Sequence, residues 1–375
     1  MKVAIIESIF ILLLFLVSFV LGLTRKNASV NQIGRIFPDT SRTLKALCCI
    51  LIIIEHYALR VDEGVFGKIM IIGGGNFSLQ IFLFLSAYGI TQSEYNKNLG
   101  IVDFFHKRVM KVAIPYAIWV TLFFFIYWQI EADPKEDEMK VGRVTPSFAT
   151  IGSHQIGVIQ YFRYLFGIDS FCGHLWFVGV TLYHYVAFFV CKTLFSLQYK
   201  RIKCFCAYAL LMGAFCIFTM VLQFPAHYWR NLWALVLGLF VALFENRLLQ
   251  LSNLKKIFSY LLGNILVTTY LIGTHSNSLI EITLYVLVAN IGVVFVLFLN
   301  RIFTQYTLKV SSPIGILVVL SYSIYLVHGM LLTLEWWYIG FQSLILIVVS
   351  SIIFGNIYEK LQFNFKQIRS VVTGL

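Results

Sequence analysis

Apolar segments long enough to cross a lipid bilayer recur along the whole chain. A run of about 17–25 residues spans the roughly 30 Å hydrocarbon core as an α-helix. The runs do not alternate between polar and apolar positions, and a helix satisfies its own backbone hydrogen bonds in lipid. We therefore predict about eleven membrane helices. Their approximate bounds are 4–23, 43–59, 70–91, 112–130, 174–195, 204–222, 229–244, 256–273, 280–299, 313–334 and 338–357.

The composition excludes a soluble globular protein. Hydrophobic residues make up 59% of the 375 residues, and only 12% are charged, whereas soluble domains contain about 25% charged residues. A soluble core of this size could not bury that much apolar surface, so the fold class is an all-α integral membrane protein. No small-residue cleavage site follows the first run, which we interpret as a membrane helix rather than a signal peptide.

The formal net charge of +12 has a membrane explanation. With eleven crossings and the N-terminus outside, about 21 of the 29 lysines and arginines fall in inner loops, as the positive-inside rule requires. We therefore predict an outer N-terminus, an inner C-terminus and no nucleic-acid partner. In this topology 43–59 and 313–334 both run from inside to outside, and the longest loop, 131–173, lies outside.

Polar side chains inside the second apolar run form the first candidate site. Lys45 and His56 are eleven residues apart, so at about 100° per residue they share one helix face to within roughly 20°. Glu55 adjoins His56 but points about 100° away. Two interpretations are open. Either Lys45 snorkels to the inner surface while Glu55 and His56 lie in the outer interface, or these groups face a polar cavity.

A basic segment before the fourth run forms the second candidate site. FFHKRVMKVAIPYAIW contains His106, Lys107, Arg108 and Lys111, and Arg108 and Lys111 share a face if the helix begins early. Lysine and arginine both recognise phosphate. The alternative is an ordinary positive flank that contacts lipid headgroups.

Two further histidines fall near the outer side of the predicted topology. His174 opens the fifth run, and His328 lies on a polar stripe with Ser321 and Tyr325. Such a stripe is commonly a hydrogen-bonded seam between helices. Together with His56, however, these histidines suggest outer chemistry served by an inner cluster of cations, an arrangement that suits a substrate spanning the membrane.

Two other features carry no predicted chemistry. The glycines at 73–75 stand at a helix entrance without the pattern of a phosphate-binding loop. The seven cysteines lack the spacing of a metal site, so we expect no metal and interpret the cysteines as small hydrophobic residues.

Five motifs occur in a distinctive order between residues 45 and 328. Lys45 and His56 match a basic residue, ten intervening positions and a histidine. The later motifs are NFSLQIFLFLSAYGI (76–90), KRVMKVAIPY (107–116), HLWFV (174–178) and SYSIYLVH (321–328). In these residues the chain resembles the membrane acyltransferase-3 family, whose members O-acylate cell-surface carbohydrates. It departs from the family pattern at Lys45, usually Arg, at Ala87, usually Gly, and at Thr181, where many members carry Glu.

The resemblance implies a ten-helix membrane domain at 43–359. An extra N-terminal helix and a basic cytoplasmic loop (1–42) precede it, and a basic tail (360–375) follows. It also implies a membrane O-acetyltransferase without a permanently bound cofactor, in which acetyl-CoA donates from the cytoplasm through a polar channel to a hydroxyl of an outer carbohydrate or glycoconjugate. Lys107, Arg108 and Lys111 would bind its phosphates. The other implied site residues are His56 as general base, Lys45 and Glu55 in support, His328 and His174 at the acceptor or the oxyanion, and Ser86 as the carrier in a covalent variant.

Two non-enzymatic alternatives are open. The chain could be a secondary transporter or a flippase for a lipid-linked sugar, since many helices with buried polar groups suit that role. It could also be a sensor on an acyltransferase-like fold. The expected location is the bacterial cell membrane, in contact with membrane lipid, and the sequence leaves open the acceptor, the acyl group and the oligomeric state.

Overall fold

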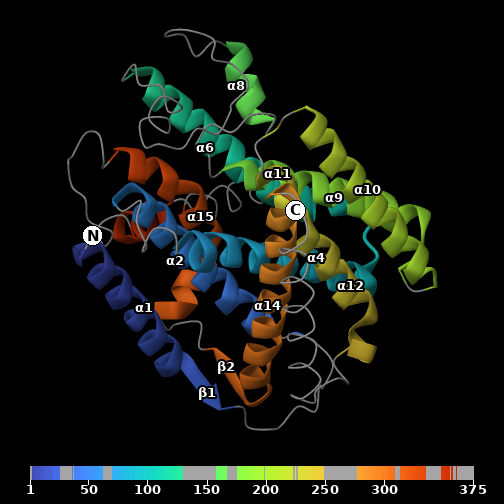
Figure 1. The fold of residues 1–375 in the computed structure, drawn as a ribbon, viewed down its shortest axis with the longest axis horizontal. Helices are drawn as coiled ribbons and strands as arrows, with labels where there is room; N and C mark the ends of the chain where they lie inside the picture. Colours follow the sequence, from blue (N-terminus) through green and yellow to red (C-terminus); the bar gives the residue numbers. More distant parts are fainter. Residues whose placement is uncertain are drawn as a thin grey trace, which may run out of the picture. The chain divides into compact units, whose positions relative to one another are not determined.

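The computed structural model is almost entirely helical (Figure 1). The chain divides into two compact units. The structure describes residues 2–25, 36, 38–61, 70–129, 158–166, 175–197, 199–222, 224, 227–248, 277–308, 313–334, 348–354, 356–357 and 360. Four helical stretches in this part of the chain are long and apolar enough to cross a bilayer, and these are Ile5–Gly22, Trp176–Leu194, Arg201–Val221 and His227–Phe244. Most side chains of the first and third stretches stay exposed, as lipid-facing helices require.

Nine of the eleven predicted membrane segments coincide with long helices among the described residues. The helices are α1 (Lys2–Gly22), α2 (Pro38–Val61), α4 (Phe77–Lys97), α6 (Met110–Gln129), α9 (Trp176–Leu194), α10 (Arg201–Val221), α12 (Leu232–Leu248), α14 (Asn277–Gln305) and α15 (Pro313–Leu334). The predicted segment 256–273 and most of 338–357 lie outside the described residues. The all-α membrane class is confirmed, while the number eleven stays a prediction.

The first unit combines residues from both ends of the chain, namely 1–28, 38–78 and 305–375. In it α15 packs along α2 (Figure 1). The Cys49 thiol donates to the carbonyl of Ser321 (3.3 Å), and His56 stacks on His328. The second contact lies seven residues, about two turns, after the first on both helices. The helices α2 and α15 therefore run in the same direction. This agrees with the common direction predicted for the two segments.

A two-stranded antiparallel ribbon, which the hydropathy pattern does not predict, joins the end of α1 to the segment before α15. Strand β1 (Leu23–Arg25) pairs with β2 (Tyr306–Leu308), and the Thr307 hydroxyl donates to Asp39 of α2 (2.7 Å). At the other end, the Tyr57 hydroxyl donates to Glu7 of α1 (3.4 Å). The end of α1 therefore lies near the starts of α2 and α15, which makes α1 antiparallel to both, as alternating crossings require.

The second unit comprises residues 29–37 and 79–304. Besides the long helices it contains α5 (Ile101–Phe104), the π-helical turn η2 (Phe105–Val109), α8 (Val158–Leu165) and α11 (His227–Arg230). Here α9 packs on α10, and α8 packs on α6 through a 2.8 Å hydrogen bond between the Thr121 and Tyr161 hydroxyls. Gly238 lets α12 approach α4, because a Cβ there would lie 2.4 Å from the Phe84 carbonyl oxygen.

Candidate functional site

A carboxylate and an imidazole meet near the end of α2. Nδ1 of His56 lies 3.0 Å from Oε2 of Glu55. The Glu55 side chain is buried (8% exposed), whereas that of His56 is 25% exposed. The sequence prediction that these neighbours point apart holds for their Cβ positions only, because the two side chains are long enough to bend together. A carboxylate only accepts hydrogen bonds, so Nδ1 carries the proton and Nε2 is the basic nitrogen of the neutral His56 ring.

The ring of His328 lies against the ring of His56. The two centroids are 5.4 Å apart with an angle of 17° between the planes, and His328 is completely buried. Nδ1 of His328 lies 2.6 Å from the carbonyl oxygen of Tyr325. Because a carbonyl can only accept, this contact fixes the proton of His328 on Nδ1 and makes Nε2 its basic nitrogen. The SYSIYLVH motif on α15 and the end of α2 therefore meet at this pair of histidines.

This arrangement is suited to moving a proton. The Glu55 carboxylate holds the protonated Nδ1 of His56, which leaves Nε2 as the nitrogen that can accept a proton. Two stacked imidazoles hold one positive charge more readily than two. A neutral imidazole beside a carboxylate and a second imidazole is an arrangement that can serve as a general base. We call Glu55, His56 and His328 the histidine site.

The glycine run explains how Glu55 is held. Gly74 and Gly75 belong to the π-helical turn η1 (Ile71–Asn76), which packs against α2. A Cβ at Gly75 would lie 2.8 Å from Cδ of Glu55 and 3.1 Å from its Oε1. One at Gly74 would meet the backbone oxygen of Leu51 at 3.1 Å. The glycines thus permit a close approach of backbone to the Glu55 side chain.

Replacing Gly75 by alanine should reduce activity more than stability. The new methyl group would displace the carboxylate of Glu55, which is the movable end of a flexible side chain, and so would disturb its contact with His56. We expect kcat to fall by about tenfold or more, since small misplacements of catalytic groups are costly, with little change in melting temperature. Gly89→Ala is the matched control, because a Cβ there meets nothing within 4 Å. Equal activity of the two variants would contradict a role for Gly75.

The other residues predicted for the histidine site have different placements. Lys45 is half-buried on α2, eleven residues before His56 in one continuous helix. Ser86 lies on α4 in the second unit, and its hydroxyl donates to the Phe82 carbonyl (2.8 Å) within the same helix. Thr181 makes the same kind of local hydrogen bond on α9 (2.8 Å). His174 lies outside the described residues.

The basic segment is helical from residue 101 onward, through α5, η2 and α6. The early helix start that the sequence argument needed is therefore present, although η2 is a π-turn, a feature frequent at functional sites. Lys107 pairs with Asp103 (3.4 Å), and both side chains are exposed. Lys111 is exposed as well. Arg108 differs from both, because its side chain is only 28% exposed and points toward α4.

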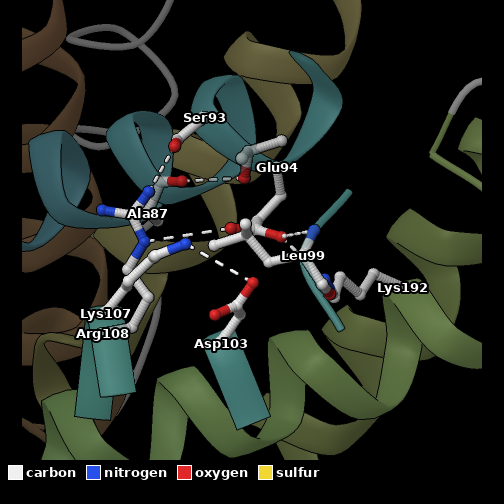
Figure 2. Close-up of polar contacts among 9 residues, drawn as sticks. Ala87, Ser93, Glu94, Leu99, Asp103, Lys107, Arg108 and Lys192 are labelled. Atoms are coloured by element: carbon white, nitrogen blue, oxygen red, sulfur yellow. Dashed lines mark hydrogen bonds and ion pairs between the residues drawn. The ribbon is translucent and has the colours of Figure 1, made fainter. Parts of the chain in front are cut away.

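A buried carboxylate that the sequence analysis missed organises this region. The Glu94 side chain on α4 is fully buried, and Figure 2 shows Arg108 and Lys192 on opposite sides of it. Its Oε2 lies 2.7 Å from Nζ of Lys192 and accepts from the backbone N–H of Leu99 (3.1 Å). Its Oε1 lies 3.9 Å from Nε of Arg108, whose Nη2 donates to Ser93. We call Glu94, Lys192 and Arg108 the charge cluster.

Lys192 corrects one assumption of the sequence analysis. The positive-inside count treated it as an inner-loop charge, but its side chain is 4% exposed in the last turn of α9. Glu94 was missed because the predicted segment 70–91 ends before it, whereas α4 continues to Lys97. A carboxylate beyond one apolar run and a lysine at the end of another are the only sequence signals for this pair.

Comparison with known proteins gives one family match, and it includes the residues of both sites. The sequence model of the acyltransferase-3 family, described as an acyltransferase domain, matches residues 42–357, which include the histidine site and the charge cluster. The searches of curated proteins and of solved structures found no match. Because the match covers most of the chain, it favours an enzyme over a transporter or a flippase. The chain belongs to the acyltransferase-3 family, and it is a membrane acyltransferase.

Proposed function

We propose that this protein transfers an acetyl group from cytoplasmic acetyl-CoA to a hydroxyl of an extracytoplasmic carbohydrate or glycoconjugate, with His56 as the general base. The observation that carries the proposal is the histidine site, in which Glu55 orients His56 and His328 lies against its ring. A sugar hydroxyl is a poor nucleophile at neutral pH, and an imidazole titrates in the range where a base for it is needed. Family membership supplies the reaction class.

The chemical step needs one proton acceptor and one proton donor. Nε2 of His56 takes the proton of the acceptor hydroxyl while its oxygen attacks the thioester carbonyl. The new C–O bond forms, the C–S bond breaks, and the thiolate of CoA leaves. The imidazolium then gives its proton to this thiolate. Glu55 stabilises the imidazolium between these events. In this direct transfer Ser86 carries no acyl group, in keeping with its local hydrogen bond to Phe82.

The donor is proposed to bind through its phosphates. Arg108 and Lys111 are the cations assigned to them, since guanidinium and phosphate form strong charge-assisted hydrogen bonds. Lys107 contributes less, because Asp103 already neutralises part of its charge. The positive-inside bias supports an inner side for this segment and an outer side for the end of α2, with the N-terminus outside and the C-terminus inside.

Acetyl transfer by the purified protein tests this proposal. The protein in lipid nanodiscs is incubated with acetyl-CoA carrying a radiolabelled acetyl group, and surface carbohydrate prepared from cells without the protein serves as acceptor. We expect the label to appear in this carbohydrate. We also expect mass spectrometry to find the added mass of one acetyl group in surface carbohydrate from cells with the protein and not in that from cells without it. Uptake of a lipid-linked sugar into vesicles without label transfer would contradict the proposal and favour a flippase.

A further inference from the structure

The charge cluster holds two cations and one anion. Glu94 contributes one negative charge, and Lys192 and Arg108 contribute one positive charge each. All three side chains lie in the second unit, on α4, α9 and η2. The formal sum is therefore one positive charge, and the question is which of the two cations Glu94 neutralises.

The distances assign Glu94 to Lys192. Nζ of Lys192 is 2.7 Å from Glu94, while Nε of Arg108 is 3.9 Å away, beyond hydrogen-bond range. Lys192 is also held in place by the Leu99 carbonyl (2.7 Å) and by the rings of Phe104 and Phe189, at 5.0 and 5.1 Å from Nζ. A fixed ammonium at this distance neutralises most of the negative charge of the buried carboxylate. The positive charge of Arg108 is therefore left largely uncompensated.

Glu94 is nevertheless poised to capture Arg108. Within the described residues, Oε1 of Glu94 and Nε of Arg108 are both buried atoms that lack a hydrogen-bond partner. They face each other at 3.9 Å, so a movement of about 1 Å would close an ordinary charge-assisted hydrogen bond. An arginine paired in that way would lose much of its attraction for an external anion.

We propose that Lys192 keeps Glu94 from neutralising Arg108 and thereby keeps Arg108 available to the phosphate groups of the acyl donor. This inference rests on the proposed function, in which Arg108 binds that donor. Glu94 and Lys192 are then positioning residues, since they act on the donor through Arg108. The Glu94–Lys192 pair is neutral as a unit, so its value to binding lies in occupying the carboxylate and not in added positive charge.

Two variants, one without Lys192 and one without both Lys192 and Glu94, test whether Lys192 acts by occupying the Glu94 carboxylate or only by adding positive charge near the donor. The full-length protein in detergent micelles is titrated with CoA, and the dissociation constant is measured by calorimetry. We expect Lys192→Met to weaken CoA binding by about tenfold or more, because Glu94 then pairs with Arg108. The double variant Glu94→Gln/Lys192→Met should return to within a few-fold of the unmodified protein, because no carboxylate remains to pair with Arg108.

Two controls make the outcomes distinct. Lys203→Met removes an exposed cation on α10 and should leave CoA affinity nearly unchanged. Melting temperatures identify variants that fail to fold, and the double variant is expected to fold because a buried ion pair can be replaced as a unit at little cost. Unchanged affinity in folded Lys192→Met, or a double variant as weak as the single one, would overturn the inference. If Arg108→Ala also binds CoA normally, the proposed donor site itself is wrong.

Discussion

Replacing His56 by alanine is expected to lower kcat for acetyl transfer by about 10²- to 10⁴-fold, the usual contribution of a general base. In the proposed mechanism the acceptor hydroxyl then lacks the imidazole that takes its proton, whereas the proposed phosphate contacts of acyl-CoA do not involve that imidazole. The measurement is initial-rate kinetics of the purified variant with labelled acetyl-CoA. Because the side chain is partly exposed, the variant should fold and insert normally.

Two further variants of α2 sharpen this test. Tyr57→Phe changes the next residue and removes the phenol oxygen that donates to Glu7 of α1 but keeps the ring, so it should keep nearly full kcat. Glu55→Gln keeps the shape of the side chain but removes the negative charge that would stabilise an imidazolium. Its kcat should therefore lie between those of Tyr57→Phe and His56→Ala. Wild-type activity in a folded His56→Ala protein would exclude His56 as the base and leave His328 as the next candidate.

Replacing Arg108 by alanine is expected to raise the KM for acyl-CoA by about 10- to 100-fold with a smaller change in kcat. A hydrogen bond between charged groups contributes about 1.5–3 kcal/mol, and each 1.4 kcal/mol corresponds to a factor of ten in affinity. The substitution also removes the contact with Ser93 on α4, but the Glu94–Lys192 pair that anchors this end of the helix stays intact. The experiment is a donor titration at saturating acceptor.

Graded variants distinguish phosphate recognition from simple attraction. Arg108→Lys keeps the charge but loses the planar fork, so it should recover only part of the donor affinity. Lys107→Ala should have a smaller effect than Arg108→Ala, since Lys107 is paired with Asp103. Equal effects of Lys107→Ala and Arg108→Ala would indicate a diffuse basic flank of the kind that contacts lipid headgroups.

The sequence by itself determined the class of fold and the parts of the sites that depend on local pattern. Hydropathy requires only the length and composition of a run, so the nine long helices among the described residues could be located without coordinates, whereas the short helices α5, α8 and α11 could not. Helical spacing similarly predicted the polar stripe from Ser321 to His328, which the structure places against α2. Motif order predicted the family, and the family match confirmed it.

Only the tertiary structure decided which polar groups meet. That His56 stacks on His328 depends on the packing of two helices more than 250 residues apart in sequence, and hydropathy carries no information about helix partners. The role of Gly75 depends on a close approach between η1 and α2 that a glycine run alone does not reveal. Glu94 and Lys192 looked like surface charges, because a charged residue at the end of an apolar run costs little unless another helix buries it. Burial and pairing arise from contacts between distant segments, and for that reason the state of Arg108 could not be predicted from its own surroundings in the sequence.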